Sequence, residues 1–194
     1  MGRPVHCGHM PIRLRDETYK MLAGAAAGFV ATVPMTVAME LMHRRLPWTQ
    51  REPLPPRKIT MRAMKAIGVR HKLDESERLG LTLAAHFCYG TGMGAVYGPV
   101  SDRVKAPPVV KGMGYGLIVW AASYLGIVPA LGLIEPATRH RAQRNALMIA
   151  AHLVWGATLG LLTAWWSPRV KNPVPTRAGR QRDVRGRFVR AAIS

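Results

Sequence analysis

Residues 21–42 read MLAGAAAGFVATVPMTVAMELM and carry a single charge, Glu40. A helix needs roughly 20 apolar residues to cross the hydrocarbon core of a bilayer, so this block predicts a transmembrane helix. Three further blocks of the same kind follow at 79–100, 109–134 and 146–166. None of the blocks alternates apolar and polar residues, which excludes a membrane β-barrel. The sequence therefore predicts an all-α, four-span transmembrane bundle over residues 21–166.

The charged residues lie between and outside these apolar blocks. The chain has 194 residues, 48% of them apolar, with 28 Lys and Arg against 10 Asp and Glu. The long uncharged runs exclude a disordered chain and disfavour a soluble nucleic-acid binder, despite a net charge of +18. Residues 1–20 form a basic N-terminal segment, and 167–194 form an Arg-rich tail. The basic residues predicted to face anionic lipid or an acidic partner are Arg62, Lys65, Arg70, Arg180, Arg182, Arg185 and Arg187.

The first connection, between 42 and 79, predicts a basic amphipathic helix over residues 59–72. Apolar side chains lie mostly on one of its faces and basic side chains on the other, which suits a helix lying in the headgroup plane. The alternative is a helix that packs on neighbouring protein. Four prolines before it (Pro47, Pro53, Pro55 and Pro56) predict a non-helical start to the connection. Asp74 and Glu77 predict a capping box that opens the second span.

Two pairs of similar phrases suggest an internal repeat. Residues 83–94 read LAAHFCYGTGMG and residues 149–160 read IAAHLVWGATLG. Residues 29–40 read FVATVPMTVAME and 124–135 read YLGIVPALGLIE, so Val-Pro is followed by Glu in both. These matches predict a bundle built from two repeated helical hairpins, related by an axis along the membrane normal.

Small residues recur at four-residue spacing along the predicted spans. Glycines at this spacing let helix backbones approach closely, which drives helix association in lipid. Pro34 and Pro129 are expected to kink their helices. The glycines predicted to lie at helix contacts are Gly24, Gly28, Gly90, Gly94, Gly98, Gly156 and Gly160.

Ionisable residues inside a span mark functional sites by default. The repeat predicts that Glu40 and His86 lie at one depth and that Glu135 and His152 form a second pair there. One interpretation is structural, with each imidazole bonded to a carboxylate or carbonyl of another helix. A second is a ligand site, in which His86 and His152 hold a haem or chlorin. A third is a metal or proton site, which the sequence supports poorly because di-iron bundles need more ligands.

The sequence contains no pattern that points to catalysis. It has no phosphate-binding glycine loop, no dinucleotide fingerprint and no evident nucleophile. His6, Cys7 and His9 lie close together in the N-terminal segment but do not have the spacing of a four-ligand zinc site. No catalytic residue and no metal site are therefore predicted.

Several of these phrases resemble a known family. AGAAAGFVATVPMT at 23–36, PLPPRKIT at 53–60 and the AAHxxYG and AAHxxWG phrases are similar to the YagU-like group of uncharacterised bacterial inner-membrane proteins. The resemblance extends over residues 23–163. It implies a small, helical, multi-pass protein of the bacterial cytoplasmic membrane, and it supplies no activity, cofactor or catalytic residue.

Two functional expectations follow. The first is a non-enzymatic accessory subunit of a larger bacterial membrane assembly, such as an energy-transducing or photosynthetic complex, because the small-residue faces exceed what four helices need among themselves. The alternative is a haem-binding, chlorin-binding or small-molecule carrier protein that uses His86 and His152. Other membrane subunits and anionic lipids are the expected partners.

Overall fold

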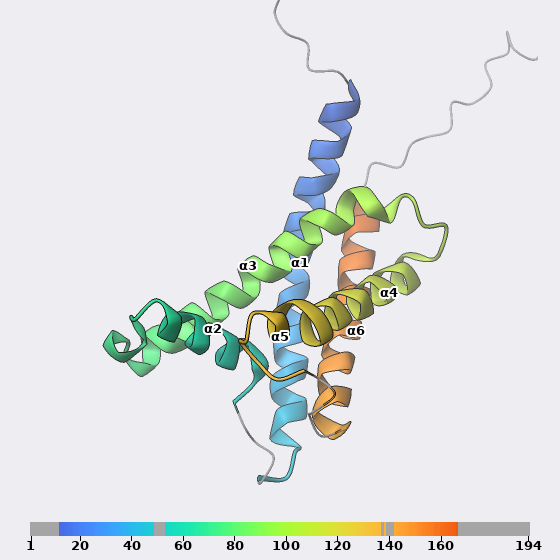
Figure 1. The fold of residues 1–194 in the computed structure, drawn as a ribbon. Helices are drawn as coiled ribbons and strands as arrows, with labels where there is room; N and C mark the ends of the chain where they lie inside the picture. Colours follow the sequence, from blue (N-terminus) through green and yellow to red (C-terminus); the bar gives the residue numbers. More distant parts are fainter. Residues whose placement is uncertain (1–11, 49–52, 137, 139–141, 167–194) are drawn as a thin grey trace, which may run out of the picture.

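The computed structural model describes residues 12–48, 53–136, 138 and 142–166, and every regular element in these ranges is helical (Figure 1). A 3-10 turn, η2, lies at Arg70–Lys72, and a π-helical segment, η3, at Ala122–Ile127. The α-helices are α1 (Ile12–Arg44), α2 (Pro55–Ala66), α3 (Glu75–Ser101), α4 (Pro108–Ala121), α5 (Val128–Ala130) and α6 (Ala142–Trp166).

Three segments are long and apolar enough to cross a membrane, which makes the chain a membrane protein by the composition of its helices. They are Asp16–Arg44, Pro108–Ala130 and Ala142–Trp166. The predicted span at 79–100 lies within α3, which does not reach the same hydropathy in the described chain. Although α3 is uncharged there, a histidine, two tyrosines and several glycines dilute its apolar residues. All four predicted spans are helical over most of their length, and three candidate spans are found among the described residues.

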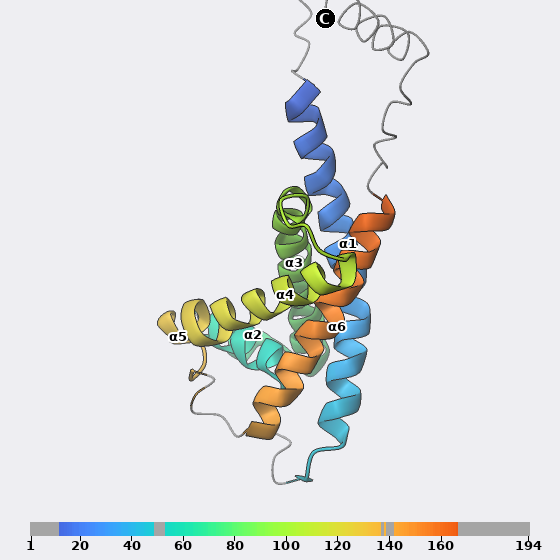
Figure 2. The ribbon, with the colours of Figure 1, turned by 90° about the vertical axis from the view of Figure 1, so that its right-hand side faces the viewer.

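The long helices α1 and α6 run antiparallel, side by side, and form one layer (Figures 1 and 2). The Tyr19 hydroxyl donates to Trp166 O at 2.9 Å near one end, and Trp155 Nε1 donates to Gly28 O at 3.3 Å further along. Figure 2 shows α2, α3 and α4 on the same side of this layer. Helix α3 packs closely on α1 and α4 packs closely on α6, whereas α3 and α4 meet through longer side chains, such as the Tyr97 and Tyr115 rings, whose centroids lie 5.0 Å apart.

Glycines bring the α1 and α3 backbones together. A Cβ atom on Gly28 would overlap Gly90 O and lie 2.9 Å from Gly94 Cα. One turn earlier, a Cβ on Gly24 would overlap Gly94 O, and a Cβ on Gly98 would overlap Lys20 O. Helices this close exclude any side chain at the crossing, so α1 and α3 form a tightly packed antiparallel pair.

Helices α4 and α6 cross in the same way. A Cβ on Gly112 would overlap Gly156 O, and a Cβ on Gly116 would overlap His152 O. Gly160 approaches Pro108 O across the same contact. All seven glycines named in the sequence analysis thus lie at backbone contacts, while Gly112 and Gly116 complete the second crossing and were not among them.

The two crossings change the register expected for the repeat. Gly28 meets Gly90 and Gly94, and Gly112 meets Gly156 and Gly160 in the same manner, so packing makes Gly28 and Gly112 equivalent. The Val-Pro match had instead paired residues 29–40 with 124–135. That alignment is about three helical turns away from the packing register, and Pro34 and Pro129 therefore occupy different places relative to their crossings.

Helix α2 begins earlier than expected and packs on protein. Pro55 and Pro56 occupy the first helical positions, where a missing N–H costs nothing because it has no intrahelical partner. The helix ends at Ala66, and Gly68 turns the chain with a φ of 77° before η2. Met61, on the apolar face, is buried, so part of the face expected to meet lipid contacts the protein instead.

The capping box at the start of α3 is confirmed. Glu77 N donates to Asp74 Oδ1 at 2.8 Å, and Asp74 N donates to Glu77 Oε2 at 2.8 Å. The hydrogen bond from the Glu77 backbone, followed by that from the Ser76 hydroxyl, holds the pKa of Asp74 below its usual value of 3.8.

Replacing Asp74 tests this cap through its pH dependence. A carboxyl whose pKa is lowered by folding stabilises the folded state above its unfolded pKa, and the stabilisation is lost as pH falls below 3.8. We expect Asp74→Ala to lower the thermal midpoint at pH 7 and to remove this acid dependence. Asp74→Asn, which can still accept the backbone bond, should lower the midpoint less. Unchanged midpoints for both variants at pH 7 would contradict the role of the cap.

Candidate functional site

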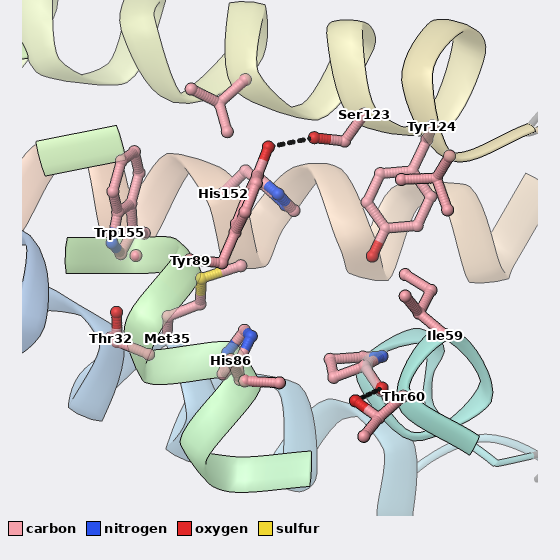
Figure 3. A pocket seen from close by; sticks show the side chains of 15 residues that line it. Thr32, Met35, Ile59, Thr60, His86, Tyr89, Ser123, Tyr124, His152 and Trp155 are labelled. Atoms are coloured by element: carbon pink, nitrogen blue, oxygen red, sulfur yellow. Dashed lines mark hydrogen bonds between the residues drawn. The ribbon is translucent and has the colours of Figure 1, made fainter. Parts of the chain in front are cut away.

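A cavity of about 210 Å³ lies between the two helix pairs (Figure 3). Helices α1 and α6 form its floor, α3 lines one side, α4 with η3 and α5 line the other, and α2 closes one end. The lining residues are Thr32, Met35, Pro56, Ile59, Thr60, Ala85, His86, Tyr89, Gly90, Val119, Ser123, Tyr124, Val128, His152 and Trp155.

His152 projects from α6 and is only 5% exposed. Its Nδ1 lies 2.7 Å from Met148 O. A carbonyl oxygen can only accept, so Nδ1 carries the proton, and in the neutral imidazole Nε2 is then an acceptor. The His152 ring meets the Tyr124 ring edge to face, with centroids 5.8 Å apart. The imidazole is thereby held in one tautomer and one orientation.

His86 lines the same cavity from α3. Its Nε2 atom is buried and has no hydrogen-bond partner in the described chain. Burying such a nitrogen without a partner costs roughly 1–3 kcal/mol. The two histidines that the repeat predicts at one depth therefore share one cavity. Of their ring nitrogens, Nε2 of His86 has no hydrogen-bond partner among the described residues.

Tyr124 contributes a third polar group, which no motif in the sequence marks as a site residue. Its side chain is 7% exposed, and its hydroxyl makes no hydrogen bond within the described residues. Figure 3 shows the ring between His152 and Ile59, with the hydroxyl pointing into the cavity. Tyr124 and Ser123 belong to η3, just before Pro129, which lacks the N–H needed to continue regular α-helical bonding. Such π-helical turns frequently occur at functional sites.

One hydrogen bond joins the two sides of the cavity. The Tyr89 hydroxyl on α3 lies 2.6 Å from Ser123 Oγ on η3. Tyr89 is 45% exposed, so this bond lies at the rim of the cavity. Together with the hydrogen bond that the Tyr115 hydroxyl on α4 donates to Met93 O on α3, at 2.8 Å, the Tyr89–Ser123 bond links these two sides.

The remaining hydroxyls in the cavity are satisfied by backbone. Thr32 Oγ1 donates to Gly28 O at 2.8 Å, and Thr60 Oγ1 donates to Pro56 O at 2.9 Å. Met35, Val119 and Trp155 make the surrounding wall apolar and buried. The free hydrogen-bonding capacity of the cavity is therefore concentrated in His86, His152 and Tyr124.

The predicted carboxylate–imidazole pairs are not formed. Glu40 Oε1 lies 2.8 Å from Arg44 Nε, one turn along α1, and its side chain is 47% exposed. Glu135 is exposed after α5. Neither acid lines the cavity, because both lie beyond the ends of the cavity-lining segments, whereas the histidines point inward. His152 bonds to the Met148 carbonyl of its own helix instead.

The cavity does not fit a haem or chlorin. Its volume is below the roughly 300–1,000 Å³ of ordinary small-molecule sites, and a four-pyrrole macrocycle belongs to the upper part of that range. The aromatic rings of Tyr124 and Trp155 occupy the space beside His152. In the described residues, no three His, Cys, Asp or Glu side chains gather closely enough to hold a metal ion.

The basic residues of the first connection have separate roles. Arg62 Nη1 donates to Leu133 O at 2.9 Å, which ties α2 to the turn after α5. Lys65 and Arg70 are exposed. The predicted tail residues (Arg180, Arg182, Arg185 and Arg187) and the His6, Cys7 and His9 cluster lie outside the described residues.

These features define a membrane protein whose described elements are helical and whose helix pairs enclose a partly open cavity lined by two histidines. Residues 46–161, more than half of the chain, match the family described as Protein of unknown function (DUF1440), and the chain belongs to this family. The match includes both histidines and most of the cavity, but it does not establish the narrower YagU-like assignment. No curated protein and no solved structure matches the chain.

Proposed function

We propose that this protein is a non-enzymatic membrane protein that binds a small lipid-soluble molecule in the cavity between its two helix pairs. The observation that carries the proposal is that His152 and Tyr124 line a largely apolar space with hydrogen-bonding capacity that no described residue uses, beside the buried and unpartnered Nε2 of His86. Buried polar groups in native proteins are normally satisfied, and a bound molecule would satisfy these. An apolar pocket with a few convergent polar groups is the usual form of a ligand site.

The composition of the lining supports the binding of an apolar molecule. It contains no carboxylate, thiol or amine. The Thr32 and Thr60 hydroxyls donate to backbone carbonyls, and Ser123 is bonded to Tyr89. The volume favours a molecule smaller than a typical drug, or one end of a longer lipid.

Toluene binding tests this proposal, because toluene is apolar and small. We expect saturable, 1:1 binding in lipid nanodiscs after subtraction of the signal from protein-free nanodiscs. Val119→Phe fills the cavity from α4 and should abolish saturable binding, whereas Val110→Phe, at a 58% exposed position of the same helix, should leave it intact. Equal binding by the two variants, or no saturable binding by the unmodified protein, would refute a ligand cavity.

An accessory role in a larger membrane assembly is a second candidate. Gly92 and Gly126 have no atom within 4 Å of the position that a Cβ would take, so these small residues leave space on outer helix surfaces. Small residues on such surfaces permit close approach of further helices. We infer that another membrane subunit packs there.

Native mass spectrometry of the protein extracted with its surrounding lipid tests the accessory role. We expect a mass above the 21.3 kDa of one chain, reduced to that of one chain by Gly92→Leu. Detection of the single chain alone would contradict the accessory role.

In the same samples, loss of co-purifying anionic lipid in a Lys65→Gln, Arg70→Gln double variant would support the lipid contact expected of these two residues.

A further inference from the structure

The hydrogen bond to Met148 O determines what the cavity offers at His152. Because Nδ1 must donate to that carbonyl, the neutral ring presents Nε2 as an acceptor. The side chain is 95% buried in an apolar bundle, where a charged ring would be costly without a counter-ion. The described cavity lining supplies no carboxylate to provide one. A molecule that satisfies His152 must therefore bring a hydrogen-bond donor.

Tyr124 adds the complementary requirement. Its ring contacts the His152 ring, and its hydroxyl is free of described partners and points into the cavity (Figure 3). A phenolic hydroxyl donates as readily as it accepts. One ligand group that both donates to His152 and accepts from Tyr124 would satisfy both side chains at once.

From this geometry, and resting on the proposed function, we propose that the cavity binds a neutral, hydroxyl-bearing apolar molecule of about the size of a simple phenol. A hydroxyl is the smallest group that donates and accepts together. A carboxylate would bring an unpaired charge into the bundle, and an ether or hydrocarbon would leave the His152 acceptor unsatisfied. The aromatic side chains Tyr89, Tyr124 and Trp155 provide surfaces against which an aromatic ring can pack.

Three ligands of nearly equal shape separate this inference from the proposed function. In p-cresol, 4-methylanisole and toluene the ring is the same, but only p-cresol has a donor. By calorimetry in nanodiscs, with subtraction of protein-free nanodiscs, we expect p-cresol to bind roughly three to ten times more tightly than 4-methylanisole. Equal affinities for all three would overturn the hydroxyl inference and leave the cavity function standing. Failure of all three to bind would remove both.

Tyr124→Phe tests the role of the free hydroxyl without removing a described hydrogen bond. We expect it to weaken p-cresol binding about threefold or more and to leave toluene binding unchanged. The matched control is Tyr115→Phe, whose lost hydroxyl donates to Met93 O outside the cavity; its p-cresol affinity should be unchanged. Equal p-cresol affinities for the unmodified protein and Tyr124→Phe would contradict the assignment.

His152→Asn provides a second, independent variant. An amide can still donate to Met148 O but presents no ring acceptor to the cavity. We expect the preference for p-cresol over 4-methylanisole to disappear while toluene still binds. A retained preference would show that the acceptor at His152 does not select the ligand.

Discussion

Gly112→Ala is expected to destabilise the protein by about 1–3 kcal/mol, the range for overpacking a tight contact. The added methyl would overlap Gly156 O and lie 3.0 Å from Gly160 Cα. Both neighbours are backbone atoms in the middle of a helix, so neither can rotate away. Helices α4 and α6 must therefore separate, which disturbs the cavity wall as well as the crossing. Reversible unfolding in mixed detergent micelles measures the loss.

Gly114→Ala is the matched control for this prediction. It lies on the same helix two residues later, and a Cβ there would meet no atom within 4 Å. Alanine has a higher helix propensity than glycine by up to about 1 kcal/mol, so the control should be neutral or stabilising. Equal stability of the two variants would show that α4 and α6 do not cross at Gly112.

Trp155→Ala is expected to have the largest effect, a loss of about 3–5 kcal/mol, as for other buried aromatic truncations. Trp155 is 2% exposed, stacks on Tyr115 with ring centroids 6.1 Å apart, and donates to Gly28 O on α1. It therefore connects the α4–α6 pair to the α1–α3 pair. Its removal takes away both packing and the interhelical hydrogen bond.

Trp165→Ala provides the comparison on the same helix. Trp165 is 77% exposed, so its truncation should change the unfolding free energy by no more than about 0.5 kcal/mol. Trp155→Phe, which keeps a ring but loses the donor, should fall between the two alanine variants. Equal losses for Trp155→Ala and Trp165→Ala would contradict a packed interface between α1 and α6.

Much of the fold could be predicted from local sequence because apolar length and glycine spacing depend on few residues. Apolar length indicates which segments form long helices, and glycine spacing indicates which helix surfaces approach closely. The register between the repeated segments could not be predicted in this way. The Val-Pro match predicts one register, but the packing makes Gly28 equivalent to Gly112 in the other copy of the repeat. The reason is that backbone contact depends on where each helix meets its partner.

The site was predictable only in part. The repeated AAH phrase drew attention to His86 and His152, and both line the cavity. Their partners were not predictable, since Glu40 is bonded to Arg44 near the end of α1 and His152 uses a carbonyl of its own helix. Tyr124 reaches the cavity through a π-helical segment, and Pro129 was the only local sign of irregular backbone there.

We propose that a single small molecule can occupy the cavity that His86 and His152 share. Nuclear Overhauser effects from bound toluene, measured with the protein in deuterated micelles, test it most directly. We predict contacts from the toluene methyl and ring protons to both imidazole rings, lost in Val119→Phe and retained in Val110→Phe. Contacts to only one imidazole, or to neither, would contradict a shared cavity.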